Sequence, residues 1–180
     1  MLQPMLSALR RIEDGFAIVA GVTLALVMIL VSADSLGRYL FNAPIDIQFE
    51  LTQNHLLVMA TVLAYSWGVR EGAHMRVEFV VSHLPAWMQR LVVVMSSAAA
   101  AAIFGGVTYY SGIDVIEAWR NNEMTMGVID WPVVYSRIWI PLGGGLLTLR
   151  LLAMVAIALT PTVPLATIYG EEHSPEALVD

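Results

Sequence analysis

Four long apolar runs constrain the fold of this 180-residue chain more than any other feature of its sequence. They cover residues 15–33, 51–69, 91–113 and 138–159. Because a helix needs about 20 apolar residues to cross about 30 Å of hydrocarbon, each run is a candidate membrane span. The sequence therefore predicts an all-α membrane protein, with four transmembrane helices in a single domain over residues 1–160.

Composition supports the membrane prediction and removes several kinds of function. Hydrophobic residues make up 58% of the chain and charged residues only 13%, whereas soluble domains carry about 25% charged residues. The absence of Cys excludes disulfides, thiol catalysis and Cys-ligated metals. All nine cations are Arg and form no basic patch, so we expect no nucleic-acid partner. The acidic tail over residues 161–180 is expected to be disordered.

The segment before the first run has its own helical pattern. Its apolar residues recur at helical spacing: Leu2, Met5, Leu6, Leu9 and Ile12. With Arg10 and Arg11 alongside, they predict a short amphipathic helix on the membrane surface. The Arg pair and the following run also resemble a signal peptide, but the run is longer than the usual core of about 7–15 residues. We therefore expect a retained first span.

The distribution of Arg predicts the orientation in the membrane. If the N-terminus is cytoplasmic, the inside carries five Arg residues: Arg10, Arg11, Arg70, Arg76 and Arg90. The outside then carries three: Arg38, Arg120 and Arg137. This excess favours cytoplasmic N- and C-termini. Arg150 lies inside the fourth run, and we expect its side chain to snorkel to the nearer interface or to contact lipid.

Small residues and prolines predict local packing. Ala17, Gly21 and Ala25 recur at intervals of four, which favours close approach of another helix in lipid. Pro132 follows a Trp and predicts the start of the fourth helix. Pro141 lies further inside that helix and predicts a kink, because Pro removes one backbone hydrogen bond.

One face of the second run is partly polar. Its members are spaced for one side of a helix: Glu50, Gln53, Asn54, Leu57 and Thr61. Lipid cannot satisfy these polar groups, so we expect this face to turn toward protein or water. Glu50 has two open interpretations: a coupling-ion or proton site, or an interface carboxylate paired with an Arg.

The connection between the first two runs holds the charges nearest to that face. Asp34 and Arg38 are four residues apart and can pair on the first helix. Only a short loop separates Arg38 from Glu50, so these two can also pair, with Asp34 as a competitor. We expect a charge cluster at this membrane face, as a partner interface or a structural device.

The remaining polar residues do not predict an enzyme. His55 is the one His within a run, and a bis-imidazole haem would need a second; His74, His83 and His173 lie outside. No phosphate loop, catalytic triad or metal-ligand spacing occurs, so we expect no cofactor. An interfacial segment between the second and third runs holds the densest charges, which include Arg70, His74, Arg76 and Glu78.

Taken in order, several landmarks resemble those of a known family. They are Arg38-Tyr39-Leu40-Phe41, Phe49-Glu50-Leu51, the stretch from Arg70 to Glu78, Leu84-Pro85, Trp131-Pro132 and Ile140-Pro141-Leu142-Gly143. The set is similar to the small membrane subunit of TRAP (tripartite ATP-independent periplasmic) transporters, the DctQ-like family. The family often has a Trp before the Glu-Leu pair, where this chain has Ile45-Asp46-Ile47.

The resemblance implies a scaffold role in the inner, or cytoplasmic, membrane of a bacterium or archaeon. The implied partners are a large many-spanning permease subunit with the substrate and sodium sites, a periplasmic substrate-binding protein, and membrane lipids. The implied substrate is a small solute that bears a carboxylate. Two rivals remain open: a self-sufficient small four-helix transporter, for which Glu50 is the candidate acid, and a membrane anchor subunit of a redox complex.

Overall fold

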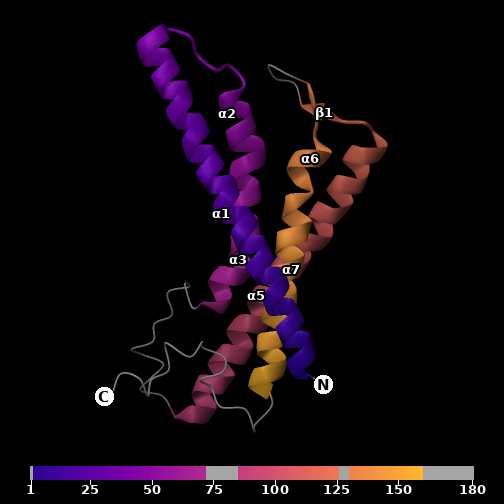
Figure 1. The fold of residues 1–180 in the computed structure, drawn as a ribbon. Helices are drawn as coiled ribbons and strands as arrows, with labels where there is room; N and C mark the ends of the chain where they lie inside the picture. The colour runs from indigo at the N-terminus through magenta and orange to yellow at the C-terminus, as the bar shows by residue number, and fades with distance from the viewer. Residues whose placement is uncertain (1, 72–84, 126–129, 160–180) are drawn as a thin grey trace, which may run out of the picture.

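A computed structural model describes residues 2–71, 85–125 and 130–159, and helices dominate all three segments (Figure 1). Within these residues, three helices are long and apolar enough to span a membrane: Leu6–Phe41, Trp87–Arg120 and Val134–Leu159. The prediction of an all-α membrane protein is therefore confirmed at the level of class. The predicted interfacial segment with His74, Arg76 and Glu78, and the acidic tail, lie outside the described residues.

Helix α1 (Leu2–Phe41) is continuous over 40 residues. The segment predicted as a separate surface helix therefore forms the first turns of α1. No Pro lies between Ile12 and the first apolar run, so nothing interrupts the hydrogen-bond ladder there. The helix ends where Asn42 adopts a left-handed φ of 50°.

The second apolar run folds as three successive helical pieces. These are α2 (Gln48–Leu51), the π-helical turn η1 (Thr52–Leu56) and α3 (Leu57–Arg70). The π turn carries one extra residue per turn, and the Leu57 N–H donates to the Thr52 carbonyl. No one of these pieces has the length of a span. The second predicted span, and with it the total of four, is therefore not confirmed and stays a prediction.

Helix α5 (Ala86–Arg120) leads into a small hairpin at the upper end in Figure 1. Strand β1 (Met124–Thr125) pairs antiparallel with β2 (Trp131–Pro132), with Met124 opposite Pro132. The prediction that the fourth helix begins near Trp131-Pro132 is confirmed, although these two residues themselves pair as a strand. The helix begins just after them, as α6 (Val134–Arg137) and then α7 (Trp139–Leu159).

The helix is interrupted for one residue at Ile138, between α6 and α7, and the kink predicted at Pro141 stays a prediction. Pro141 has no N–H to donate to the carbonyl four residues earlier, so the regular ladder is broken just before it.

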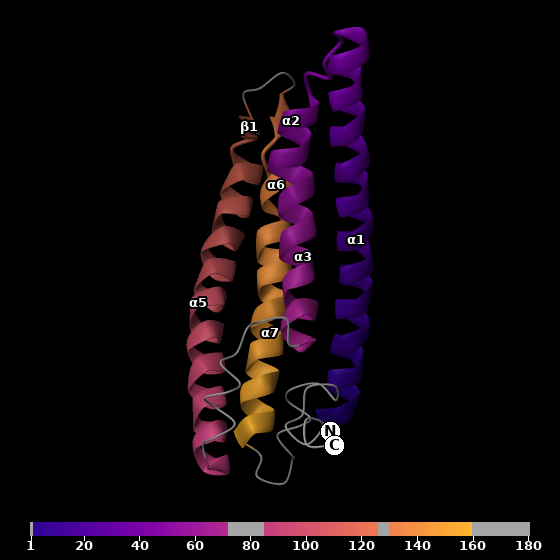
Figure 2. The same ribbon diagram turned by 90° about the vertical axis from the view of Figure 1, so that its left-hand side faces the viewer.

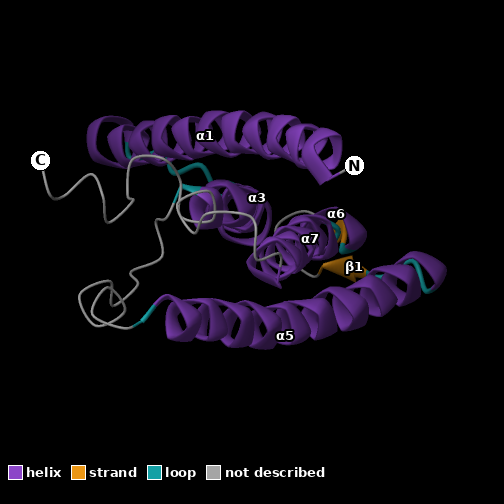
Figure 3. Ribbon diagram, turned by 90° about the horizontal axis from the view of Figure 1, so that it is seen from below, coloured by secondary structure: helices purple, strands orange, loops and turns teal. Residues whose placement is uncertain are grey.

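The helices pack around α7. Figures 2 and 3 show α1 and α5 on opposite outer sides, with α3 and α7 between them. Helix α7 packs against both α5 and α3, while α1 packs mainly against α3. A Cβ built on Gly143 would lie 2.5 Å from Val62 Cγ1, so a glycine is needed where α7 crosses α3. A Cβ on Gly144 would lie 2.8 Å from Thr108 Oγ1 of α5.

Candidate functional site

A buried ion-pair network joins three helices at the lower end of the bundle, where α1 begins. At its centre is Glu13, whose relative exposure is 0%. Glu13 Oε1 accepts a hydrogen bond from Ser66 Oγ at 2.7 Å. Its Oε2 lies 3.4 Å from Arg70 Nη1 and 3.7 Å from Arg150 Nη1. We call these four residues the Glu13 network; it connects α1 to α3 and α7.

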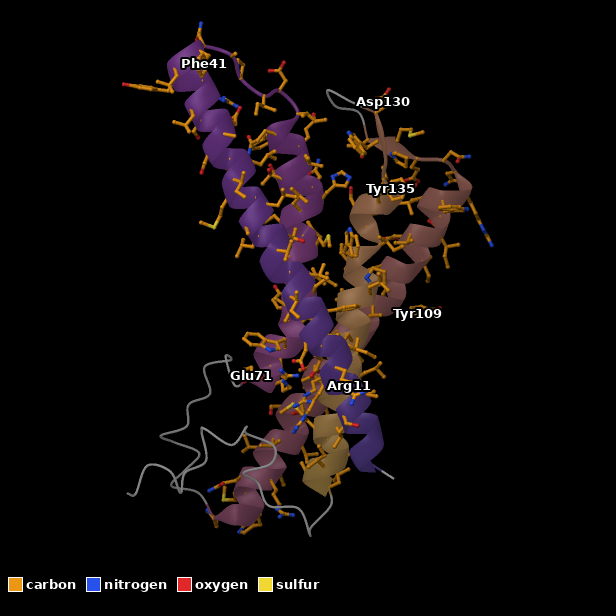
Figure 4. All side chains as sticks on the ribbon, in the orientation of Figure 1. Arg11, Phe41, Glu71, Tyr109, Asp130 and Tyr135 are labelled. Carbon is orange, nitrogen blue, oxygen red and sulfur yellow. The ribbon has the colours of Figure 1, made fainter. Side chains whose placement is uncertain are left out.

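Arg70 extends the Glu13 network toward the surface. Its Nη2 lies 2.6 Å from Asp14 Oδ1, and its Nε lies 2.9 Å from Glu71 Oε1. Figure 4 shows Glu71 and Arg11 at this same level of the bundle. Burial alone would lower the pKa of Arg70, but hydrogen bonds and charges from its carboxylate neighbours hold that pKa above its usual value. The guanidinium therefore stays charged.

Arg150 is buried, with 8% relative exposure, rather than extended to water or lipid. The snorkelling predicted from its place in an apolar run is not what the structure shows. Glu13 supplies a counter-charge inside the bundle, so the side chain does not need to reach the interface. Arg150 Nε has no hydrogen-bond partner within the described residues.

At the upper end, Asp34 organises the turn between α1 and α2. Its Oδ2 accepts from Arg38 Nε at 2.8 Å, and its Oδ1 accepts from the Ile45 N–H at 2.8 Å. The predicted Asp34–Arg38 pair within α1 is thus confirmed, and the Ile45 N–H bond to Asp34 ties the following loop back to that helix. Pairing of Arg38 with Glu50 stays a prediction.

The polar face of the second run points out of the bundle. Gln53, Asn54, Leu57 and Thr61 are all exposed. The Thr61 hydroxyl donates to the Leu57 carbonyl at 2.7 Å, but the side-chain amides of Gln53 and Asn54 make no hydrogen bond with any described residue. By contrast, Gln48 on α2 is buried, and its Nε2 donates to Thr52 Oγ1 at 3.4 Å. The described residues therefore do not cover these two amides.

His55 takes part in a contact between the two halves of the bundle. Its Nε2 lies 3.0 Å from Ser136 Oγ on α6, and its ring centroid lies 5.8 Å from that of Trp131. Nδ1 is buried without a partner among the described residues. His55 thus connects η1 to the segment before α7.

A groove of about 600 Å³ runs between α1 and α3. Its lining is mostly apolar and includes Trp67, while Asp14 is the charged residue of the lining. Five of the lining residues are small: Ala17, Ala20, Gly21, Ala60 and Ala64. A Cβ on Gly21 would meet nothing within 4 Å, so this groove is open to the outside of the bundle. We call it the α1–α3 groove.

Sequence reasoning found Arg70 and Arg150 but missed Glu13 and Ser66. The available signal was Arg150 itself, since a cation within an apolar run requires a nearby acid. The sequence could not identify which acid, because Glu13 is 137 positions away along the chain.

The described part of the chain also contains no group of three or more His, Cys, Asp or Glu side chains placed to hold a metal ion. The fold and the paired buried charges define a multi-pass helical membrane protein.

The family model described as Tripartite ATP-independent periplasmic transporters, DctQ component, matches residues 27–160. The chain belongs to this family, as its landmark residues indicated. It is therefore a component of a TRAP transporter. The DctQ family is a family of transporter components and not of enzymes. No curated protein sequence matches the chain significantly.

Proposed function

We propose that this chain is the small scaffold subunit of a sodium-coupled, binding-protein-dependent secondary transporter. It would pair with a large permease subunit that carries the transport sites, and a periplasmic binding protein would deliver a small solute bearing a carboxylate. Family membership supports the transporter role, and the family resemblance motivates the sodium coupling and the substrate class.

One observation carries the scaffold role: each buried charged side chain among the described residues has an ion-pair partner within the chain. These side chains are Glu13, Asp34 and Arg150. An acid that couples transport to an ion must exchange its partner during each cycle. A carboxylate held between helices by an Arg instead favours a rigid element, which suits a fixed support for a moving partner.

Reconstitution tests this proposal. Proteoliposomes with this chain alone should show no uptake of radiolabelled C4 dicarboxylates or sialic acid, two carboxylate-bearing probes. Adding the large subunit and the binding protein of the same transporter should restore uptake of the solute that this binding protein retains, and only with a sodium gradient. Uptake by the chain alone would refute the scaffold role, and sodium-independent uptake by the full set would refute the coupling.

We further propose that both termini face the cytoplasm. The start of α1 and the end of α7 lie at the same end of the bundle, which supports this arrangement (Figure 1). Since the chain has no Cys, single cysteines can be placed on a clean background. Ser7→Cys should resist a membrane-impermeant maleimide in intact cells, and Asp130→Cys, at the opposite end in Figure 4, should react. The reverse pattern would overturn the orientation.

A further inference from the structure

Two unpaired amides mark a surface that lipid does not suit. Gln53 and Asn54 are exposed, and neither side-chain amide makes a hydrogen bond with the described residues. They lie five and six residues into the helical stretch that starts at Gln48, or about 8 Å along its axis. In the membrane span predicted over residues 51–69, a carboxamide that faced hydrocarbon would keep none of the hydrogen bonds that water offers it. A polar partner therefore suits these two amides better than an acyl chain.

The local backbone is also unusual at this point. The two amides belong to η1 (Thr52–Leu56), and single π turns within α-helices occur frequently at functional sites. Here the buried Gln48 satisfies its amide inside the bundle, one turn before the two exposed amides. The same helical stretch thus satisfies an inward amide and leaves two outward amides for an external partner.

The amides continue into a concave apolar surface. Leu57, Thr61 and Ala64 follow Asn54 at helical spacing, and Thr61 and Ala64 also line the α1–α3 groove. Across the groove, Ala17 and Gly21 of α1 present little side chain. In membranes, such small-residue surfaces allow a second helix to approach closely. One continuous surface therefore offers hydrogen bonds at its upper part and a hollow at its lower part.

We propose that this surface, formed by Gln53, Asn54, Thr61 and the α1–α3 groove, docks a transmembrane helix of the large permease subunit. The inference rests on the proposed function, which supplies the partner. The docked helix carries a hydrogen-bonding side chain opposite the amides. About 10 Å further along, it carries bulky aliphatic side chains that fill the groove.

The shape argues against two other occupants. A lipid chain would fill the groove but leave both amides without partners. A second copy of this chain, paired in parallel about an axis along the membrane normal, would set groove against groove. Two concave surfaces with small residues leave a void between them, and a void forfeits the packing contacts on which helix association in lipid depends. A convex helix of a different subunit satisfies both parts of the surface.

Steric filling of the groove is the first test. Ala64→Phe should lower recovery of the coexpressed large subunit in detergent pull-down by at least about tenfold, because the ring occupies the place of the docked helix. Ala102→Phe, at an exposed small residue on α5, is the matched control and should leave recovery unchanged. The melting temperature of each variant chain alone reports whether it still folds.

Hydrogen bonding is tested by Gln53→Leu combined with Asn54→Leu. Loss of two interhelical hydrogen bonds should weaken the complex by about fivefold to tenfold, while the isolated chain inserts as well as before. If the double variant binds the large subunit as tightly as the unaltered chain, the amides do not contact it and the proposal fails.

Photo-crosslinking locates the partner inside the membrane, where a thiol does not ionise. A diazirine-bearing amino acid in place of Thr61 should crosslink to the large subunit in the complex. The same amino acid in place of Ile103, on α5 with 66% exposure, should not. If the complex forms and position 61 gives no crosslink to the large subunit, the docking surface is wrong although the proposed function stands. If position 61 crosslinks to a second copy of this chain, the surface is self-associating and the docking proposal fails. If the unaltered chain never recovers the large subunit, the proposed function itself fails, and the docking proposal with it.

Discussion

The two ends of the bundle hold together in different ways. At the lower end, the Glu13 network links α1, α3 and α7 through one fully buried carboxylate. At the upper end, the Asp34 contacts stay within one hairpin, and the pair α1–α3 diverges from the pair α5–α7 (Figure 1). At the upper end, His55 of η1 contacts Ser136 and Trp131, and these contacts connect the α1–α3 pair to the α5–α7 pair.

The difference shows where rigidity arises in this fold. A buried charge that loses its partner is strongly unfavourable, so the Glu13 network resists separation of the helices it joins. A single side-chain hydrogen bond, such as that between His55 and Ser136, contributes much less. We therefore expect the lower end to set the arrangement of the helices, and the upper end to adjust more readily.

The largest effect is expected from Glu13→Ala. It leaves Arg70 and Arg150 without their shared buried partner, and we expect a loss of about 3–5 kcal/mol in the free energy of unfolding. The measurement is SDS-induced unfolding of the purified chain. Glu71→Ala is the control, because Glu71 also pairs with Arg70 but is half-exposed, so its loss should stay below about 1 kcal/mol. Equal losses for the two variants would remove the distinction between buried and exposed pairs.

Gly143→Ala should come next, since it acts where α7 crosses α3. The new Cβ would lie 2.6 Å from the Val62 carbonyl oxygen, which is backbone and cannot turn away. Separation of the helices should reduce the free energy of unfolding by about 1–3 kcal/mol. Gly106→Ala on α5 meets nothing within 4 Å and should be neutral. If both variants melt at the same temperature as the unaltered chain, the close crossing does not hold the bundle together.

Ser136→Ala tests the upper bridge. It removes the partner of His55 Nε2, and we expect a loss of about 1 kcal/mol in the free energy of unfolding. Ser111→Ala serves as the control, because the Ser111 hydroxyl donates to Val107 within its own helix. A loss for Ser136→Ala as large as that of Glu13→Ala would show that the upper end is not the weaker one.

The smallest effect on the whole fold is expected from Asp34→Ala. It frees the Ile45 N–H, so hydrogen exchange should accelerate in the loop over residues 42–46 while the melting temperature barely changes. Asp46→Ala, an exposed carboxylate in the same loop, should leave exchange unaltered. A large fall in melting temperature for Asp34→Ala would mean that this hairpin supports the bundle as well.

Local features of this protein could be predicted because their causes are local. The apolar runs over residues 15–33, 91–113 and 138–159 each predicted a span that the structure contains. Transfer of a helix into lipid depends on its composition and length, which are local properties. The Asp34–Arg38 pair followed from a spacing of four on one helix. The one-residue interruption before Pro141 also has a local cause, because the missing N–H is a property of that residue itself.

Other features depended on neighbours that the sequence does not name. The π turn at Thr52–Leu56 has no composition that distinguishes it from an α-helical turn, and it divides a run that looks like one span. Trp131-Pro132 forms a strand because Met124-Thr125 lies beside it. Snorkelling was a reasonable expectation for an Arg in an apolar run, but it assumed that no acid was within reach.

Sequence alone was enough to place this chain in a membrane, to locate three of its long apolar helices and to indicate its family. Those properties follow from the hydrophobicity, length and order of segments along the chain. Only the tertiary structure decided that Glu13 meets Ser66, Arg70 and Arg150, and that Gln53 and Asn54 face outward. Such pairings depend on which helix faces lie against each other, and many helix arrangements bury the same apolar surface while bringing different polar groups together.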